Sequence, residues 1–243
     1  MKTPTERLHK RIAASGICSR RTAETMISEG RVMVNGEMVT QMGVMVTDAD
    51  EIHVDGRSIG RAKSYTLLMN KPVGIVTSLS DPQGRPTVKN LLPDMGVQLK
   101  PVGRLDMDSE GLIIFTNDGE LAQRLTHPRH KVEKEYEVVV VGRPSDHALQ
   151  RLRKGVHIED GMTAPAIVEL PRQKGSDTSL IRITIFEGRK RQVRQMCDVV
   201  GHPVISLKRI RIGPLRLHKM PRGSCRMLSQ VELGVLRKAV GLA

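Results

Sequence analysis

Residues 101–121 read Pro-Val-Gly-Arg-Leu-Asp-Met-Asp-Ser-Glu-Gly-Leu-Ile-Ile-Phe-Thr-Asn-Asp-Gly-Glu-Leu, and this stretch decides much of the fold. The apolar run 111–116 predicts a buried strand, and the Asn-Asp-Gly after it predicts a turn into a helix over 120–125. Asp106 lies in the Gly-rich loop before that strand. An aspartate in such a loop is most often a turn residue, and beside Arg104 it could form no more than a surface ion pair. Taken alone, the stretch leaves the role of Asp106 open.

Beyond this stretch, residues 64–243 alternate strand and helix signals. Lys71–Thr77 predicts a turn followed by a strand. Further strands are expected at 65–69, 136–141, 166–170, 180–186, 204–207 and 214–217, and helices at 145–155 and 190–200. Strands joined mostly by turns, with helices between them, indicate an α+β domain with a mixed or antiparallel sheet.

The first sixty residues follow a different pattern. Residues 6–30 predict two short helices, with Ser19 as the N-cap of the second. Asn35-Gly36 between two apolar runs predicts a hairpin. A polar stretch at 60–64 then resembles a linker. We therefore expect a small helix-helix-strand module over residues 1–63 and a larger domain over residues 64–243.

The charge of the chain points to a polyanionic partner. The 243 residues carry a formal net charge of +13, and residues 182–226 hold 12 basic and 2 acidic groups, a net of +10. A smaller basic cluster lies near the N-terminus and comprises Arg7, Lys10, Arg11, Arg20 and Arg21. Because no apolar run reaches the length of a membrane span, nucleic acid is favoured over a membrane surface. Three widely spaced cysteines without a CxxC pair indicate reduced thiols and a cytoplasmic protein.

Two further segments carry candidate binding residues. Tyr136 alternates with apolar residues in a strand, where a tyrosine is most often a core or rim residue. In Gly188-Arg-Lys-Arg-Gln-Val-Arg194, helical spacing would place Arg191 and Arg194 on one face. A basic, solvated helix that binds phosphates explains most of these arginines equally well.

The strings together resemble two known families. Residues 5–52 resemble the S-four-type RNA-binding module of a ribosomal small-subunit protein, which implies binding of structured RNA through shape and phosphates. Residues 5–235 resemble the RsuA/RluB-like pseudouridine synthases that act on ribosomal RNA, whose catalytic domain has a bent, mainly antiparallel sheet. This chain departs from that family at Lys190, where asparagine is usual, and at Gln195, where arginine is usual.

The second resemblance implies roles for individual residues. Asp106 would be the catalytic residue, kept ionised by Arg194, and Tyr136 and Leu207 would sandwich the target uracil. Arg104 would enter the RNA stem or hold a phosphate. Contacts with RNA phosphates are expected from the basic clusters, that is from Arg7, Lys10, Arg11, Arg20, Arg21, Arg189, Lys190 and Arg191.

The same resemblance implies a reaction that needs no cofactor. We expect no metal site either, because His127 and His130 have Pro128 between them and no evident third ligand. The loop at 80–87 and the His127-Pro-Arg segment resemble the large-subunit branch most, so 23S rRNA is favoured over 16S as the substrate of a monomeric enzyme. Whether Asp106 attacks the sugar, attacks the base or abstracts a proton stays open.

Two other functions fit part of the sequence. A non-catalytic rRNA-binding or ribosome-assembly factor would explain the charge and the N-terminal module, but not the separate strings at 103–106, 134–138 and 188–194. A DNA-binding regulator could use residues 6–30 as a helix-turn-helix, but the turn carries basic groups rather than base-reading side chains.

Overall fold

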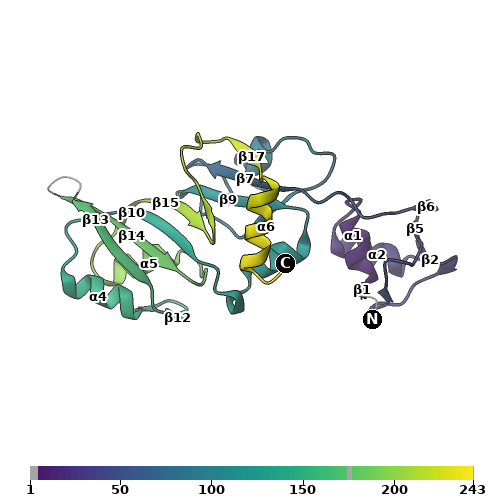
Figure 1. The fold of residues 1–243 in the computed structure, drawn as a ribbon, viewed down its shortest axis with the longest axis horizontal. Coiled ribbons are helices and arrows are strands. Elements are labelled where there is room, and N and C mark those ends of the chain that lie inside the picture. The colour runs from purple at the N-terminus through teal and green to yellow at the C-terminus, as the bar shows by residue number, and fades with distance from the viewer. Residues whose placement is uncertain (1–4, 174–176, 243) are drawn as a thin grey trace. The chain divides into compact units, whose positions relative to one another are not determined.

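The computed structural model describes residues 5–173 and 177–242 (Figure 1). Residues 5–65, together with 94–99 and 117–119, form one compact unit, and the remaining described residues form a second. Among these residues, no helix combines the length and the apolar character that a membrane span requires. Each unit has a core of its own.

The smaller unit begins with the two predicted helices, α1 (Leu8–Ala14) and α2 (Arg20–Ser28). The Ser19 hydroxyl accepts a hydrogen bond of 3.1 Å from the backbone N–H of Thr22, so the predicted N-cap is confirmed. The apolar faces of both helices turn inward. Their buried side chains are Leu8, Ile12, Ala23 and Ile27.

Short strands complete this unit. Strands β2 (Val32–Val34), β3 (Glu37–Met38), β5 (Ile52–Val54) and β6 (Arg57–Ser58) form a sheet in the order β3-β2-β5-β6, and β1 (Glu6–Arg7) pairs with β4 (Met45–Val46). The β2–β3 turn places Asn35 and Gly36 at φ 53° and 85°, as a tight hairpin requires. The predicted hairpin is confirmed.

The larger unit is built on a mainly antiparallel sheet, which confirms the predicted α+β class. Nine strands are described, in the order β13-β14-β10-β15-β9-β7-β17, with β16 added to β15 and β8 added to β9. Their bounds are β7 Thr66–Lys71, β8 Lys100–Val102, β9 Glu110–Thr116, β10 Lys134–Val141, β13 Ile167–Gln173, β14 Thr178–Ile185, β15 Val204–Ile212, β16 Leu215–Arg216 and β17 Cys225–Met227. A separate two-stranded hairpin joins β11 (His157–Ile158) and β12 (Gly161–Met162).

One pairing in this sheet is parallel, that of β9 with β15. It spans only two residue pairs, Lys208 with Glu110 and Arg209 with Gly111. The strands approach so closely here that a Cβ on Gly111 would lie 2.3 Å from the backbone oxygen of Arg209, and Gly111 has φ +110°. Glycine is therefore required where the two halves of the sheet meet.

Helices cover the faces of the sheet. These are α3 (Gly119–Thr126), α4 (Asp146–Lys154), α5 (Gln192–Val199) and α6 (Gln230–Ala239), with short 3-10 turns η1 (Val88–Leu91) and η2 (Pro128–His130). Leu236 of α6 and Leu121 of α3 share a core with Leu68 of β7 and with Leu112 and Ile114 of β9. In Figure 1, α6 crosses the strands β7 and β9.

The structure differs from the sequence predictions in two places. Strand β7 runs on to Lys71, and residues 72–77 form a loop with a single bridge, Val76 to Thr87, rather than a strand. Lys71 belongs to the strand because its ammonium is buried and donates to the backbone oxygens of Ser109 and Pro72. Helix α6 was not predicted at all.

Candidate active site

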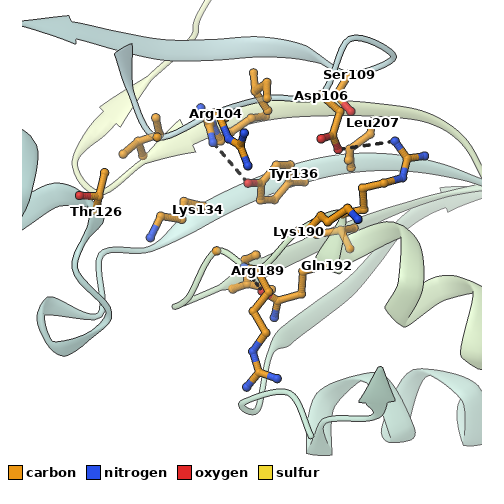
Figure 2. A pocket seen from close by; sticks show the side chains of 18 of the residues that line it. Arg104, Asp106, Ser109, Thr126, Lys134, Tyr136, Arg189, Lys190, Gln192 and Leu207 are labelled. Carbon is orange, nitrogen blue, oxygen red and sulfur yellow. Dashed lines mark hydrogen bonds and ion pairs between the residues drawn. The ribbon is translucent and has the colours of Figure 1, made fainter. Parts of the chain in front are cut away.

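A pocket of about 250 Å³ opens on the larger unit, between the loop before β9, strands β10 and β15, and the segment that leads into α5 (Figure 2). It brings together most of the residues singled out in the sequence, namely Arg104, Asp106, Tyr136, Arg189, Lys190, Arg191 and Leu207. Among the described residues that line it, Asp106 is the one carboxylate, facing six basic side chains. The site is thus strongly cationic around a single acid.

The loop that carries Asp106 is held at both ends. The Thr77 hydroxyl donates to the backbone oxygen of Leu105 at 2.7 Å and accepts from its N–H at 3.3 Å. At the other end, the Lys71 ammonium donates to the backbone oxygen of Ser109 at 2.8 Å. The Asp106 side chain itself stays 38% exposed, on the pocket side. The carboxylate is therefore fixed in position yet accessible.

Tyr136 and Leu207 lie on the adjacent strands β10 and β15. In the pairing of β10 with β15, Tyr136 stands opposite Arg209, and Leu207 lies two residues earlier on β15. Because side chains two apart on a strand share a face, Leu207 and Arg209 border the same pocket as Tyr136. Figure 2 shows the Tyr136 ring between Lys134 on one side and Asp106 and Leu207 on the other.

The guanidinium partners differ from those expected. Arg194 does not reach Asp106: its Nη2 lies 3.3 Å from Oδ1 of Asp108 and donates to the Asp108 backbone oxygen at 2.9 Å. Arg191 is the arginine near both carboxylates, with Nη1 3.8 Å from Asp106 and Nη2 3.0 Å from Asp108. The reason is local. Arg191 lies just before α5 and has a left-handed backbone conformation, with φ 50°. Arg191 and Arg194 therefore do not share one helix face, although their spacing predicted that they would.

Asp108 thus binds both arginines, a role that the sequence did not suggest. Burial acts to raise the pKa of Asp108, but the hydrogen bond from Arg191 and the charges of Arg194 and Arg191 leave that pKa below its ordinary value. The carboxylate is ionised at neutral pH and gathers two arginines beside Asp106.

Arg189 and Lys190 are placed differently from each other. Arg189 donates to the backbone oxygens of Asp160, Gly161 and Met162 in the β11–β12 hairpin. Lys190 is exposed, and its backbone oxygen accepts from the Gln195 side chain at 2.9 Å. The Arg189 guanidinium is therefore hydrogen-bonded within the protein, whereas the Lys190 side chain is exposed to solvent. The two positions that depart from the family form, 190 and 195, contact each other.

Three basic residues of the site were missed or underused in the sequence interpretation. Burial lowers the pKa of Lys134, in the pocket wall, to about 8, and the charge of Arg209 adds to this. Burial also lowers the pKa of Lys71 to about 8, although Asp106 acts to raise it. Arg209 could have been found from strand periodicity, two residues after Leu207. Lys71 carried no local signal, because its burial depends on the tertiary fold.

The basic residues of the smaller unit also divide into two kinds. Arg7, Lys10, Arg20 and Arg21 are exposed. Arg11 is only 7% exposed and pairs with Glu6 at 3.0 Å and Asp48 at 2.5 Å. Its charge is neutralised inside the unit, so a phosphate contact from Arg11, as the sequence suggested, does not fit this geometry.

Comparison with known proteins identifies the family of this chain. The family model described as RNA pseudouridylate synthase matches residues 65–198, and the S4 domain model matches residues 6–52. The chain therefore belongs to the RNA pseudouridine synthases, isomerases that convert uridine to pseudouridine, and it carries an RNA-binding S4 domain. This confirms both resemblances seen in the sequence.

Individual relatives cover nearly the whole chain. The chain is 42% identical to the ribosomal large subunit pseudouridine synthase B of Bacillus subtilis, over 96% of each chain. It is 44% identical to an uncharacterized RNA pseudouridine synthase of Aquifex aeolicus, over 97% of this chain and 95% of the relative. A solved structure described as a pseudouridylate synthase matches with a TM-score of 0.69 and 31% identity, covering 95% of this chain and 99% of that one.

Proposed function

We propose that the protein converts a specific uridine of ribosomal RNA to pseudouridine, with Asp106 as the catalytic residue. One observation carries this proposal. Among the described residues that line the pocket, Asp106 is the one carboxylate, and it is surrounded by basic side chains. Tyr136 and Leu207 border the same pocket. An aspartate carboxylate in such a pocket can act as nucleophile or base.

The target base would enter this pocket by flipping out of its stem. A flipped base loses its stacking neighbours, and the Tyr136 ring offers a replacement face, with Leu207 closing the other side. Exposed Arg104 and Lys190 at the pocket would hold the flanking phosphates. Arg194 would act through Asp108 rather than on Asp106 directly.

Large-subunit RNA is the favoured substrate. The resemblance of residues 80–87 and of His127-Pro-Arg supports 23S over 16S, and so does the similarity to the large-subunit enzyme of Bacillus subtilis. Residues 1–63 would bind the RNA and residues 64–243 would carry out the chemistry. The net charge of +13 favours this polyanion, and we propose a monomer that acts in the cytoplasm without a cofactor.

The deciding experiment is a pseudouridine map of total rRNA from cells with and without this protein. One 23S uridine should lose its modification in the deletion strain and regain it when the wild-type protein is supplied. Supplying Asp106→Asn should not restore it, whereas Asp146→Asn, in the first turn of α4 and outside the pocket, should.

Other results of the map would change the proposal. A lost 16S position would overturn the choice of subunit. An unchanged map, combined with altered ribosomal particles, would favour the non-catalytic assembly factor.

A further inference from the structure

Arg209 is a buried cation without an acidic partner. The residue is 4% exposed, and its guanidinium forms no ion pair with any carboxylate of residues 5–173 or 177–242. Removing a guanidinium from water is costly unless its donors and its charge are compensated. Neighbouring Arg211 on the same strand shows the ordinary solution, since it pairs with Glu133 and Glu135. Arg209 needs another explanation.

The donors of Arg209 are only partly used. Nε donates to the backbone oxygen of Leu112 at 2.7 Å, which anchors the group to β9. Nη1 lies 3.5 Å from the Tyr136 hydroxyl, at the limit of a hydrogen bond, and Cζ lies 6.0 Å from the ring centroid. Nη2 has no hydrogen-bond partner within the part of the chain that the structure describes. The guanidinium is therefore fixed in place with unused donor capacity.

Its position connects this capacity with the substrate. Arg209 lines the pocket that holds Asp106, and in the sheet it stands opposite Tyr136, the residue proposed to stack on the base. A planar base resting on the ring would thus have its polar edge near a fixed positive charge.

We propose that Arg209 donates a hydrogen bond to a carbonyl oxygen of the flipped uracil and stabilises the negative charge that the base acquires during the reaction. This inference rests on the proposed function, with Asp106 as the residue that starts the reaction. A preorganised donor aimed at a developing oxyanion is a strong contributor to catalysis in a site shielded from water.

The role holds for each way in which Asp106 could act. If an Asp106 oxygen bonds to C1′, the C1′–N1 bond breaks and its electron pair leaves with the base. If Asp106 takes the C2′ proton, the same bond breaks with the same result. If an Asp106 oxygen bonds to C6, the C5–C6 π pair moves toward O4. In all three cases, negative charge spreads onto uracil carbonyl oxygens, and it is discharged when C5 of the turned base bonds to C1′. In the first route this breaks the C1′–O bond and frees Asp106; in the second, the proton returns from Asp106 to C2′; in the third, the C1′–N1 bond breaks as C1′ passes to C5, and the C6–O bond then breaks to free Asp106. In each route C5 finally loses its proton and N1 gains one.

The test compares Arg209→Met, Arg209→Lys and Arg211→Lys in single-turnover assays on a stem-loop of the target rRNA. Arg209→Met should lower the rate constant of the chemical step by about 10²- to 10³-fold, as removal of one oxyanion donor does. Its Kd for RNA should stay within about threefold, because phosphate contacts carry the affinity. Arg209→Lys keeps a charge and should recover part of the rate, and Arg211→Lys should turn over like the wild type.

A second measurement separates a contact with the base from mere support of Tyr136. The RNA is made with 2-thiouridine or 4-thiouridine at the target, since sulfur accepts hydrogen bonds weakly. The ratio of wild-type to Arg209→Lys rate constants should shrink on one of the two analogues and persist on the other. An unchanged ratio on both analogues would overturn the proposal, and so would a full rate in Arg209→Met.

The failures can be told apart. If Asp106→Asn retains turnover, the proposed site is wrong. If Asp106→Asn is inactive while both Arg209 variants turn over normally, only the role of Arg209 is wrong. Should Arg209→Met fail to fold, as its thermal unfolding would show, Arg209→Lys and the thio-substituted RNAs still decide the question.

Discussion

The Arg194 guanidinium is bound to Asp108, with Nη2 3.3 Å from Oδ1, although Asp106 lies only two residues away. Arg191 bridges the two acids from the other side, at 3.0 Å from Asp108 and 3.8 Å from Asp106. Asp108 is therefore the anchor of the local charge network. Asp106, the proposed catalytic residue, shares one arginine with Asp108, and its side chain remains 38% exposed.

Replacement of Asp108 tests this arrangement. Asp108→Asn removes the charge that holds two guanidiniums close together, so both should shift and Asp106 should lose its fixed surroundings. Since misplacement by about 1 Å can lower a rate by about 10²-fold, we expect kcat to fall at least roughly tenfold with RNA binding retained. The measurement is single-turnover rate against Kd. The matched control is Glu120→Gln, because Glu120 is 61% exposed on α3, pairs with Arg124 at 2.9 Å and lies outside the pocket, so its replacement should be silent. Equal rates in the two variants would contradict the role of Asp108.

Lys134 should give the reaction a dependence on alkaline pH. Its folded-state pKa is about 8, below the ordinary value of 10.5, so the ammonium is present at neutral pH and is lost as pH rises through 8. If its charge assists the substrate in the pocket, the rate constant should fall across that range. Lys134→Arg keeps its charge at every accessible pH and should flatten this limb of the profile. An identical descending limb in wild type and Lys134→Arg would assign the titration to another group.

Gly111 should be intolerant of any side chain. Gly111→Ala places a Cβ 2.3 Å from the backbone oxygen of Arg209 at a residue with φ +110°, so either the strand pairing opens or the backbone strains. A loss of at least about 2 kcal/mol of unfolding free energy is expected. Chemical denaturation measures it. Gly234→Ala, inside α6 with no atom near its added Cβ, should instead stabilise by up to about 1 kcal/mol. Matching losses in the two variants would mean that the close approach is not what matters at Gly111.

The basic residues of the smaller unit should separate by function. Arg20→Gln and Arg21→Gln remove exposed charges, so each should weaken RNA binding and reduce the slope of log K against log salt by about one. Arg11→Gln leaves Glu6 and Asp48 without their buried partner and should lower the unfolding temperature instead. A salt slope that changes with Arg11 but not with Arg20 would contradict this division.

Local sequence signals predicted the fold well where the structure is decided locally. The Ser19 cap and the Asn35-Gly36 hairpin are set by residues next to each other, and both are confirmed. Helix α6 was missed even though a local signal was present: Ser229 and Glu232 form a capping box at its start. The loop after β7 was misjudged because Lys71 reads as polar and exposed, while the oxygens that accept its ammonium come from residues 72 and 109.

The site could be predicted residue by residue only in part. Motif resemblance selected Asp106, Tyr136 and Leu207, and the structure gathers them in one pocket. It could not predict that Arg194 binds Asp108, since the left-handed conformation of Arg191 alters how both side chains approach the acids. Nor could spacing show that Arg11 is buried.

The two-residue parallel pairing of β9 with β15 has a consequence for the order of folding. Asp106 belongs to the β8–β9 side of this seam, whereas Tyr136 and the basic segment before α5 belong to the β10–β15 side. Each side can form its own antiparallel neighbours first, but the seam closes a loop of about a hundred residues and gains few contacts when it does. We therefore expect assembly of the active site to be a late event, visible as slower recovery of amide-exchange protection at Gly111 than at Val138. A partly folded chain would then hold native strands on both sides without yet being an enzyme.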